Sequence, residues 1–154
     1  MYRSHNYPIA ARFYRKFPAS QENYVTPSQS EIRILVVDDE PGMRDFLAGF
    51  CEINGYDAEL AESGAEALNL IRNNGTYDLA IVDFLMPQMH GADFIRKIRG
   101  EEMRFPVIAM SAFDDVEKAF KEAGANVFLK KPFDPYTLEE EVKRLTRRYK
   151  ENAS

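Results

Sequence analysis

The chain has 154 residues, of which 45% are hydrophobic and 29% are charged, and its formal net charge is −5. This length and composition are typical of one globular domain with a buried core. No apolar stretch is long enough to span a membrane, and the N-terminus lacks the apolar segment of a signal peptide. The single cysteine, Cys51, excludes an internal disulfide and lies in an apolar helical pattern, so we interpret it as a small buried hydrophobe. We expect a cytoplasmic protein.

Charge divides the chain into two parts. Residues 1–30 contain four basic side chains and one acidic side chain, which leaves 16 basic and 24 acidic side chains, a net charge of −8, on residues 31–154. This acidic body argues against nonspecific binding of nucleic acid. We therefore divide the chain into an N-terminal extension, 1–30, and one domain, 31–154.

The N-terminal extension is rich in Tyr, Pro, Ser and Asn and lacks long periodic patterning. Within it, Ile9, Phe13 and Phe17 recur at the spacing of one helical turn, which predicts a short helix. Three interpretations remain open: a flexible extension, a docking arm for a partner or an anionic surface, and an organellar transit peptide.

From residue 31 onward, predicted buried strands alternate with predicted amphipathic helices. The strands are apolar runs rich in β-branched residues, and the helices carry apolar residues three and four positions apart. Proline or a capping side chain begins several helices, and glycine follows several of them. In chain order we expect a strand at 32–37, a helix at 41–53, a strand at 57–61, a helix at 63–74, a strand at 79–83, a helix at 91–99, a strand at 106–110, a helix at 114–123, a strand at 127–129 and a helix that begins at 135.

Alternation of this kind demands a parallel sheet with helices on both faces. Right-handed crossovers then favour a doubly wound α/β fold, a flavodoxin-like three-layer sandwich with the strand order 2-1-3-4-5. In this order the first and third strands are neighbours. Sheets of this class bind ligands at the carboxyl ends of their strands, so that edge is where we look for a site.

Polar residues stand at the ends of four of the five strands. Asp38 and Asp39 follow the first strand, Asp83 ends the third, Ser111 follows the fourth and Lys131 follows the fifth. Carboxylates crowded at one edge repel each other unless a hard divalent cation binds among them, and Mg²⁺ prefers oxygen ligands. We therefore predict a Mg²⁺ site at which Asp83 is a nucleophile that accepts a phosphoryl group. Ser111 would donate to a phosphoryl oxygen, and Lys131 would supply a positive charge.

Each of these residues also has an ordinary interpretation. The acidic pair suits the N-terminus of a helix, and the aspartate, the serine and the lysine suit a turn, a helix cap and a solvated side chain. Their coincidence at four strand ends favours the joint site. We expect Lys130 to point away from this site, and we interpret His90 as a loop residue because it has no partner at the spacing of metal ligands.

Short blocks of sequence surround these residues: VVDDEP at 36–41, DFLMP at 83–87 with Gly91, SA at 111–112 and KPF at 131–133. Together the blocks resemble the receiver domain of two-component response regulators, the CheY-like superfamily. The resemblance extends over residues 31–150. It implies that Asp83 is the phospho-accepting aspartate and that Asp38 and Asp39 hold Mg²⁺ together with Asp83 and the backbone carbonyl of Leu85.

The same resemblance implies a conformational switch. Ser111 matches the switch hydroxyl, and Phe128 matches the aromatic side chain that turns inward with it. Lys131 matches the lysine of the phosphorylation site, which a cis peptide bond usually joins to the following proline, here Pro132. The responding surface would comprise the helix 114–123, the strand 127–129 and the helix that begins at 135.

The predicted function is that of a phosphorylation-controlled binding module. A sensor histidine kinase or a phosphotransfer protein would supply the phosphoryl group, and the output would go to a downstream protein or to a homodimer formed through the responding surface. The chain ends soon after its last predicted helix, so we expect no DNA-binding domain and no binding of nucleic acid. Apolar Leu85 and Phe113 stand where many relatives carry polar groups near the attacking water, which predicts slow autodephosphorylation.

Two other functions are compatible with part of this pattern. One is a Mg²⁺-dependent phosphatase with an aspartate nucleophile. Such enzymes usually carry a second acidic residue two positions after the nucleophile, and because Leu85 occupies that position, we do not expect an enzyme. The other is a degenerate receiver that binds its partner constitutively, which the complete set of phosphorylation groups disfavours.

Overall fold

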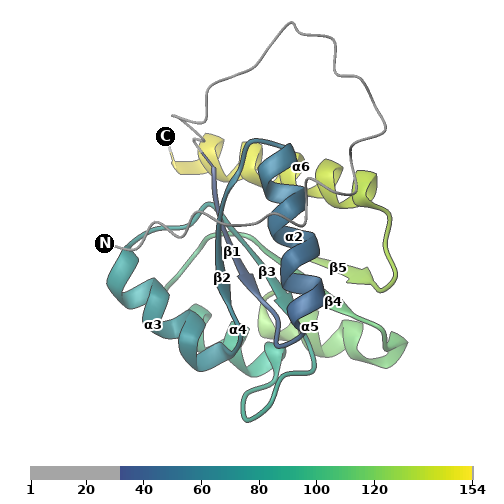
Figure 1. Cartoon of the computed structure of the whole chain (residues 1–154). Helices are drawn as coiled ribbons and strands as arrows, with labels where there is room; N and C mark the ends of the chain where they lie inside the picture. Colours follow the sequence, from purple (N-terminus) through teal and green to yellow (C-terminus); the bar gives the residue numbers. More distant parts are fainter. Residues whose placement is uncertain (1–31, 154) are drawn as a thin grey trace, which may run out of the picture.

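The computed structural model describes residues 32–153, so the short helix predicted within 1–30 lies outside the described residues. Five strands form one parallel sheet in the order β2-β1-β3-β4-β5 (Figure 1). This confirms the predicted fold class and strand order. The strands are β1 Arg33–Val37, β2 Asp57–Ala61, β3 Leu79–Asp83, β4 Val107–Ser111 and β5 Val127–Lys130.

Helices cover both faces of the sheet and complete a three-layer sandwich. Within the described residues the helices are α2 Pro41–Ile53, α3 Gly64–Asn74, α4 Gly91–Gly100, the 3-10 turn η1 Asp114–Val116, α5 Glu117–Ala123 and α6 Pro135–Ala153. In Figure 1, α2 and α6 lie on one side of the sheet, and α3, α4 and α5 lie on the other. None of these helices combines the length and the apolar character that a membrane span requires.

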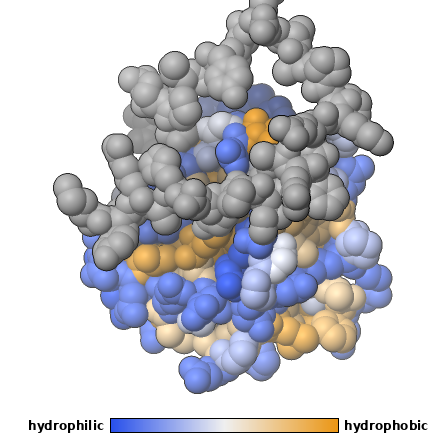
Figure 2. Space-filling model, in the orientation of Figure 1, coloured by the Kyte–Doolittle hydropathy of each residue, from blue (hydrophilic) through white to orange (hydrophobic). Residues whose placement is uncertain are grey.

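The hydrophobic core has two halves because side chains alternate along each strand. In β1, Ile34 and Val36 belong to the cluster that α2 and α6 cover, whereas Leu35 and Val37 belong to the cluster that α3, α4 and α5 cover. The strands β3 and β4 are buried throughout, which explains why they are continuous apolar runs in the sequence. Figure 2 shows that hydrophilic side chains cover much of one face, with apolar side chains in separate patches.

Cys51 lies in this core, as predicted, with no exposed surface. Burial, with a smaller contribution from the negative charge of Asp57, raises the pKa of its thiol to about 12. The side chain therefore stays a protonated thiol near neutral pH and packs as a small apolar group.

Capping residues begin and end several helices where the sequence predicts. Ser63 Oγ accepts a hydrogen bond from the Glu66 backbone N–H at 3.1 Å, and the Glu66 carboxylate accepts one from the Glu62 N–H at 2.8 Å. The Asp134 carboxylate accepts a hydrogen bond from the Tyr136 N–H at the start of α6. Gly124 ends α5 with a φ of +107°, a conformation that favours glycine.

Several element boundaries differ by one residue from the sequence predictions, and two differences lie near the carboxyl edge of β4. The strand β4 extends one residue further than predicted and includes Ser111, because Ser111 pairs with Lys130 of β5 and its carbonyl accepts a hydrogen bond from the Lys131 N–H. The helix predicted at 114–123 begins as the 3-10 turn η1 and becomes α-helical only at Glu117. Tightening of a first turn in this way is common at helix ends.

The start of α4 packs closely against the end of β3 at Gly91. A Cβ added at Gly91 would lie 2.1 Å from the backbone oxygen of Asp83, whereas one added at Gly100 would meet no atom within 4 Å. We expect Gly91→Ala to lower the free energy of unfolding by about 1–3 kcal/mol or more, because backbone must move. The control, Gly100→Ala, is expected to stabilise the protein by at most about 1 kcal/mol. Urea unfolding measures both, and equal effects of the two substitutions would contradict this account of the β3–α4 junction.

Candidate functional site

Three carboxylates meet at the carboxyl edge of the sheet. Asp38 follows β1 and is fully buried, Asp83 ends β3 and is 7% exposed, and Asp39 is exposed. One ligand oxygen from each lies within 4.8 Å of the others. The strands β1 and β3 are neighbours in the sheet, so the predicted juxtaposition of these residues is confirmed.

Lys131 brings a positive charge to this carboxylate cluster. Its Nζ lies 2.7 Å from Asp83 Oδ1 and 3.2 Å from Asp38 Oδ2, and it donates a hydrogen bond to each. The lysine side chain is only 16% exposed. The peptide bond between Lys131 and Pro132 is cis, as the resemblance implies.

The cluster is short of positive charge. Burial raises the pKa of the Asp83 carboxyl, the hydrogen bond from Lys131 lowers it, and the negative charges of Asp38 and Asp39 raise it further, with a net shift upward. Burial lowers the pKa of Lys131, but hydrogen bonds and charges from Asp83 and Asp38 outweigh burial, and its pKa is raised. Three ionised carboxylates and one ammonium group leave two negative charges, which matches a divalent cation.

The backbone around Asp38 is fixed by several contacts. Its N–H donates to the Ala61 carbonyl at 3.1 Å, and its Oδ1 accepts a hydrogen bond from the Glu40 N–H at 2.9 Å. The Arg44 guanidinium donates to the Asp38 carbonyl at 2.7 Å. We did not predict the role of Arg44 from the sequence, because an arginine that holds a backbone carbonyl leaves no recognisable pattern of residue types.

Ser111 lies at the same edge, and its hydroxyl contacts the loop that follows β4. It is 2% exposed, and its Oγ accepts a hydrogen bond from the Phe113 N–H at 3.0 Å. Within residues 32–153 no hydrogen bond joins its hydroxyl to Asp83. Lys130 points away from the carboxylates, as predicted, and forms an ion pair with Asp114 at 2.6 Å.

Aromatic side chains form a row behind the site. The ring of Phe84, the residue after Asp83, meets Phe120 edge-on at 5.2 Å between centroids, and Phe120 meets Phe128 at 5.9 Å. The His90 ring stacks on Phe84 with 5.7 Å between centroids, and His90 lies in the loop that precedes α4, as predicted. The family resemblance indicated Phe128 as a switch residue. Nothing in the sequence distinguished Phe120 from other apolar positions of its helix.

Two apolar side chains near this edge are exposed. Leu85 follows Asp83 by two residues and is 46% exposed, and Phe113 follows Ser111 by two residues and is 50% exposed. Neither side chain can act as an acid, a base or a hydrogen-bond donor toward water. The site therefore offers a carboxylate that can attack a phosphoryl group but, at these two positions, nothing that orients water.

A family model supports the same interpretation. The model of the response regulator receiver domain matches residues 34–143, more than half of the chain. The chain belongs to this family. The response regulator MprA of Mycobacterium sp. (strain KMS) is 39% identical to it over 119 residues, which are 76% of this chain and 51% of the relative. MprA of Mycobacterium tuberculosis is 37% identical over 121 residues. The receiver thus spans about half the length of the curated relatives that it matches.

Solved receiver structures share the fold. The receiver domain of the Francisella response regulator 1452 is 32% identical, with a TM-score of 0.72, and the match covers 76% of this chain and 98% of that one. The receiver domain of the sensor histidine kinase PA1611 of Pseudomonas aeruginosa PAO1 is 28% identical, with a TM-score of 0.69, and the match covers 75% and 97% of the two chains. In that protein a magnesium ion is coordinated in the active-site cleft.

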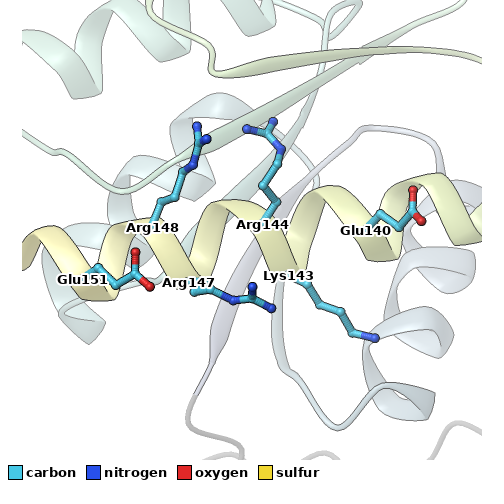
Figure 3. A pocket seen from close by; sticks show the side chains of 6 residues that line it. All are labelled: Glu140, Lys143, Arg144, Arg147, Arg148 and Glu151. Carbon is cyan, nitrogen blue, oxygen red and sulfur yellow. The ribbon is translucent and has the colours of Figure 1, made fainter.

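The receiver also has a hollow along α6, and none of the predicted site residues lines it (Figure 3). Its lining consists of charged side chains of one helix: Glu140, Lys143, Arg144, Arg147, Arg148 and Glu151. Lys143 pairs with Glu139 and Arg144 with Glu141 on the same helix. We interpret this hollow as the solvated face of an amphipathic helix whose basic residues lie toward its negative C-terminal end.

The raised pKa of Asp83, which burial causes in the first place, predicts how an amide at position 83 affects stability. The folded-state pKa of Asp83 lies above its unfolded value, so the stability linked to this group is present at low pH and is lost as the pH rises through the folded pKa. With metal removed by EDTA, Asp83→Asn is therefore expected to resist urea better than the wild type at neutral pH. The advantage should shrink on acidification toward the unfolded pKa of an aspartate.

The matched control for this experiment is Asp93→Asn. Asp93 is exposed on α4 and pairs with Arg96, so its replacement should change stability little at either pH. Lower stability of Asp83→Asn than of the wild type at both pH values would contradict a raised pKa of Asp83 in the folded protein.

Proposed function

We propose that this receiver accepts a phosphoryl group on Asp83 from a sensor histidine kinase or a phosphotransfer protein and passes the signal to a protein partner. The observation that carries the proposal is the cluster at the sheet edge. Carboxylates of Asp38, Asp39 and Asp83 lie within 4.8 Å of one another, and Lys131 Nζ lies 2.7 Å from Asp83. Family membership supports it, since receiver domains work with such donors.

In the proposed transfer, a carboxylate oxygen of Asp83 attacks the phosphorus of a phosphohistidine. An oxygen–phosphorus bond forms, the nitrogen–phosphorus bond breaks, and the imidazole leaves with the bonding electron pair. Lys131 holds Asp83 in place beforehand and can then pair with a phosphoryl oxygen. The Ser111 hydroxyl can donate to another phosphoryl oxygen once it turns from its own loop.

The donor atoms of the cluster fit Mg²⁺, which prefers carboxylate and carbonyl oxygens. We assign Asp38, Asp39, Asp83 and the backbone carbonyl of Leu85 as the protein ligands. Bound Mg²⁺ would neutralise negative charge on the transferring phosphoryl group. The net charge of −2 on the cluster with Lys131 supports a divalent rather than a monovalent ion.

The signal would leave through η1, α5, β5 and α6. Phe128 of β5 is the proposed switch aromatic, and it reaches the acceptor strand through Phe120 and Phe84. The recipient would be a downstream protein or a second copy of the receiver. The phosphatase alternative gains no support from the site, because Leu85 stands where the general acid of such an enzyme would be.

Phosphorylation of the intact chain tests the proposal. With acetyl phosphate and Mg²⁺, an Asp83 oxygen would form the new bond to phosphorus and acetate would leave with the electron pair. We expect intact-protein mass spectrometry to show one added phosphoryl group on the wild type and on the control Asp93→Asn, and none on Asp83→Asn. After the donor is removed, the phosphoryl group should persist for minutes or longer because Leu85 and Phe113 orient no water. Equal labelling of wild type and Asp83→Asn would refute the assignment of the acceptor.

A further inference from the structure

Two adjacent lysines at the end of β5 point in opposite directions. Lys131 donates to Asp83 and Asp38 inside the site, whereas Lys130 Nζ lies 2.6 Å from Asp114 Oδ1 on the outer surface. The outer pair is exposed, with side-chain exposures of 53% for Lys130 and 76% for Asp114. A single strand end thus contacts both the proposed acceptor and the segment that follows β4.

That segment begins directly after Ser111, the last residue of β4, and three contacts hold the junction. The Lys131 N–H donates to the Ser111 carbonyl at 2.8 Å, the Phe113 N–H donates to Ser111 Oγ at 3.0 Å, and Lys130 pairs with Asp114. Apolar packing adds little here, since Val116 is the only buried residue of η1 and Phe113 is half exposed. The ion pair is therefore one of a few contacts that position this loop, beside two hydrogen bonds donated by backbone N–H groups and the buried side chain of Val116.

The loop after β4 contacts the Ser111 hydroxyl directly. Its Oγ is engaged with Phe113, and within the described chain it makes no hydrogen bond to Asp83. A hydroxyl that donates to a phosphoryl group on Asp83 must turn, and its loop must shift with it. A contact that exists only before the shift favours the resting arrangement and lowers the affinity for anything that requires the shifted one.

We propose that Lys130 and Asp114 are positioning residues whose ion pair holds the Ser111 loop in its resting place and thereby restrains phosphorylation of Asp83. This inference rests on the proposed function and adds a restraint outside the phosphorylation site. An exposed ion pair has a small effect, so release of the restraint should tighten binding by about two- to fivefold.

The probe for this restraint is beryllium fluoride with saturating Mg²⁺, a phosphoryl mimic, titrated by calorimetry into the intact protein. Asp114→Asn and Lys130→Gln are each expected to bind it about two- to fivefold more tightly than the wild type. The double variant should gain no more than either single one, because both remove the same contact. Combining Asp114→Lys with Lys130→Asp restores a pair of opposite charges and should return the affinity to that of the wild type.

Asp115→Asn is the matched control. It removes the same negative charge from the neighbouring exposed position, and Asp115 has no ion pair within the described chain. If the loss of any nearby negative charge were enough to tighten binding of the anionic probe, Asp115→Asn would therefore bind as tightly as Asp114→Asn. In about 1 M NaCl, where the Debye length is about 3 Å, the effect of Asp114→Asn should shrink toward that of the control.

Two outcomes would contradict the proposed restraint alone, and a third would contradict both the restraint and the proposed function. Equal affinities of Asp114→Asn and Asp115→Asn would refute the restraint, and so would a charge swap that behaves like the single variants. Neither outcome would bear on the phosphorylation of Asp83. A wild type that binds no beryllium fluoride and gains no phosphoryl group from acetyl phosphate would remove both this inference and the proposed function.

Discussion

The contact of Lys131 with two buried carboxylates governs the rest of this structure. One ammonium group donates to Asp83 and to Asp38, residues 48 and 93 positions away in the chain, and so ties together the ends of β5, β3 and β1. Buried charges of this kind are costly unless they are paired. The sheet order that brings these strand ends together is therefore a requirement of the site as well as a consequence of the apolar pattern.

The same contact explains why the site is ready to bind more charge. One lysine cannot neutralise three carboxylates. Burial, with a smaller contribution from the negative charges of Asp38 and Asp39, outweighs the contact with Lys131 and raises the pKa of Asp83. The remaining negative charge favours a divalent cation, and a cation in turn favours the approach of a phosphoryl group. We therefore expect the carboxylates needed for phosphorylation to lower the stability of the fold when no cation is bound.

Much of this arrangement could be predicted from the sequence because its physical causes are local. Buried strands such as Leu79–Asp83 are continuous apolar runs, short connections force right-handed crossovers, and together these fix the strand order and place Asp38 beside Asp83. Contacts that depend on tertiary geometry were not predictable. Arg44 on the Asp38 carbonyl, Phe120 between two rings and the pairing of Lys130 with Asp114 each join residues whose types alone carry no signal.

The end of β4 also could not be predicted from the sequence alone. Ser111 is polar and looks like the start of a loop, but its pairing with Lys130 keeps it in the strand. The strand places its hydroxyl at the carboxyl edge of the sheet, where the Phe113 N–H of the loop that follows donates to it. The predicted N-terminal extension remains a prediction, because residues 1–30 lie outside the described chain.

Calorimetric titration of Mg²⁺ into the receiver tests the central claim most directly. If Asp38, Asp39 and Asp83 form one oxygen-rich site, the wild type should bind one Mg²⁺, Asp38→Asn and Asp83→Asn should each weaken binding strongly, and the exposed control Asp93→Asn should bind as the wild type does. Undiminished binding by both Asp38→Asn and Asp83→Asn would contradict the account.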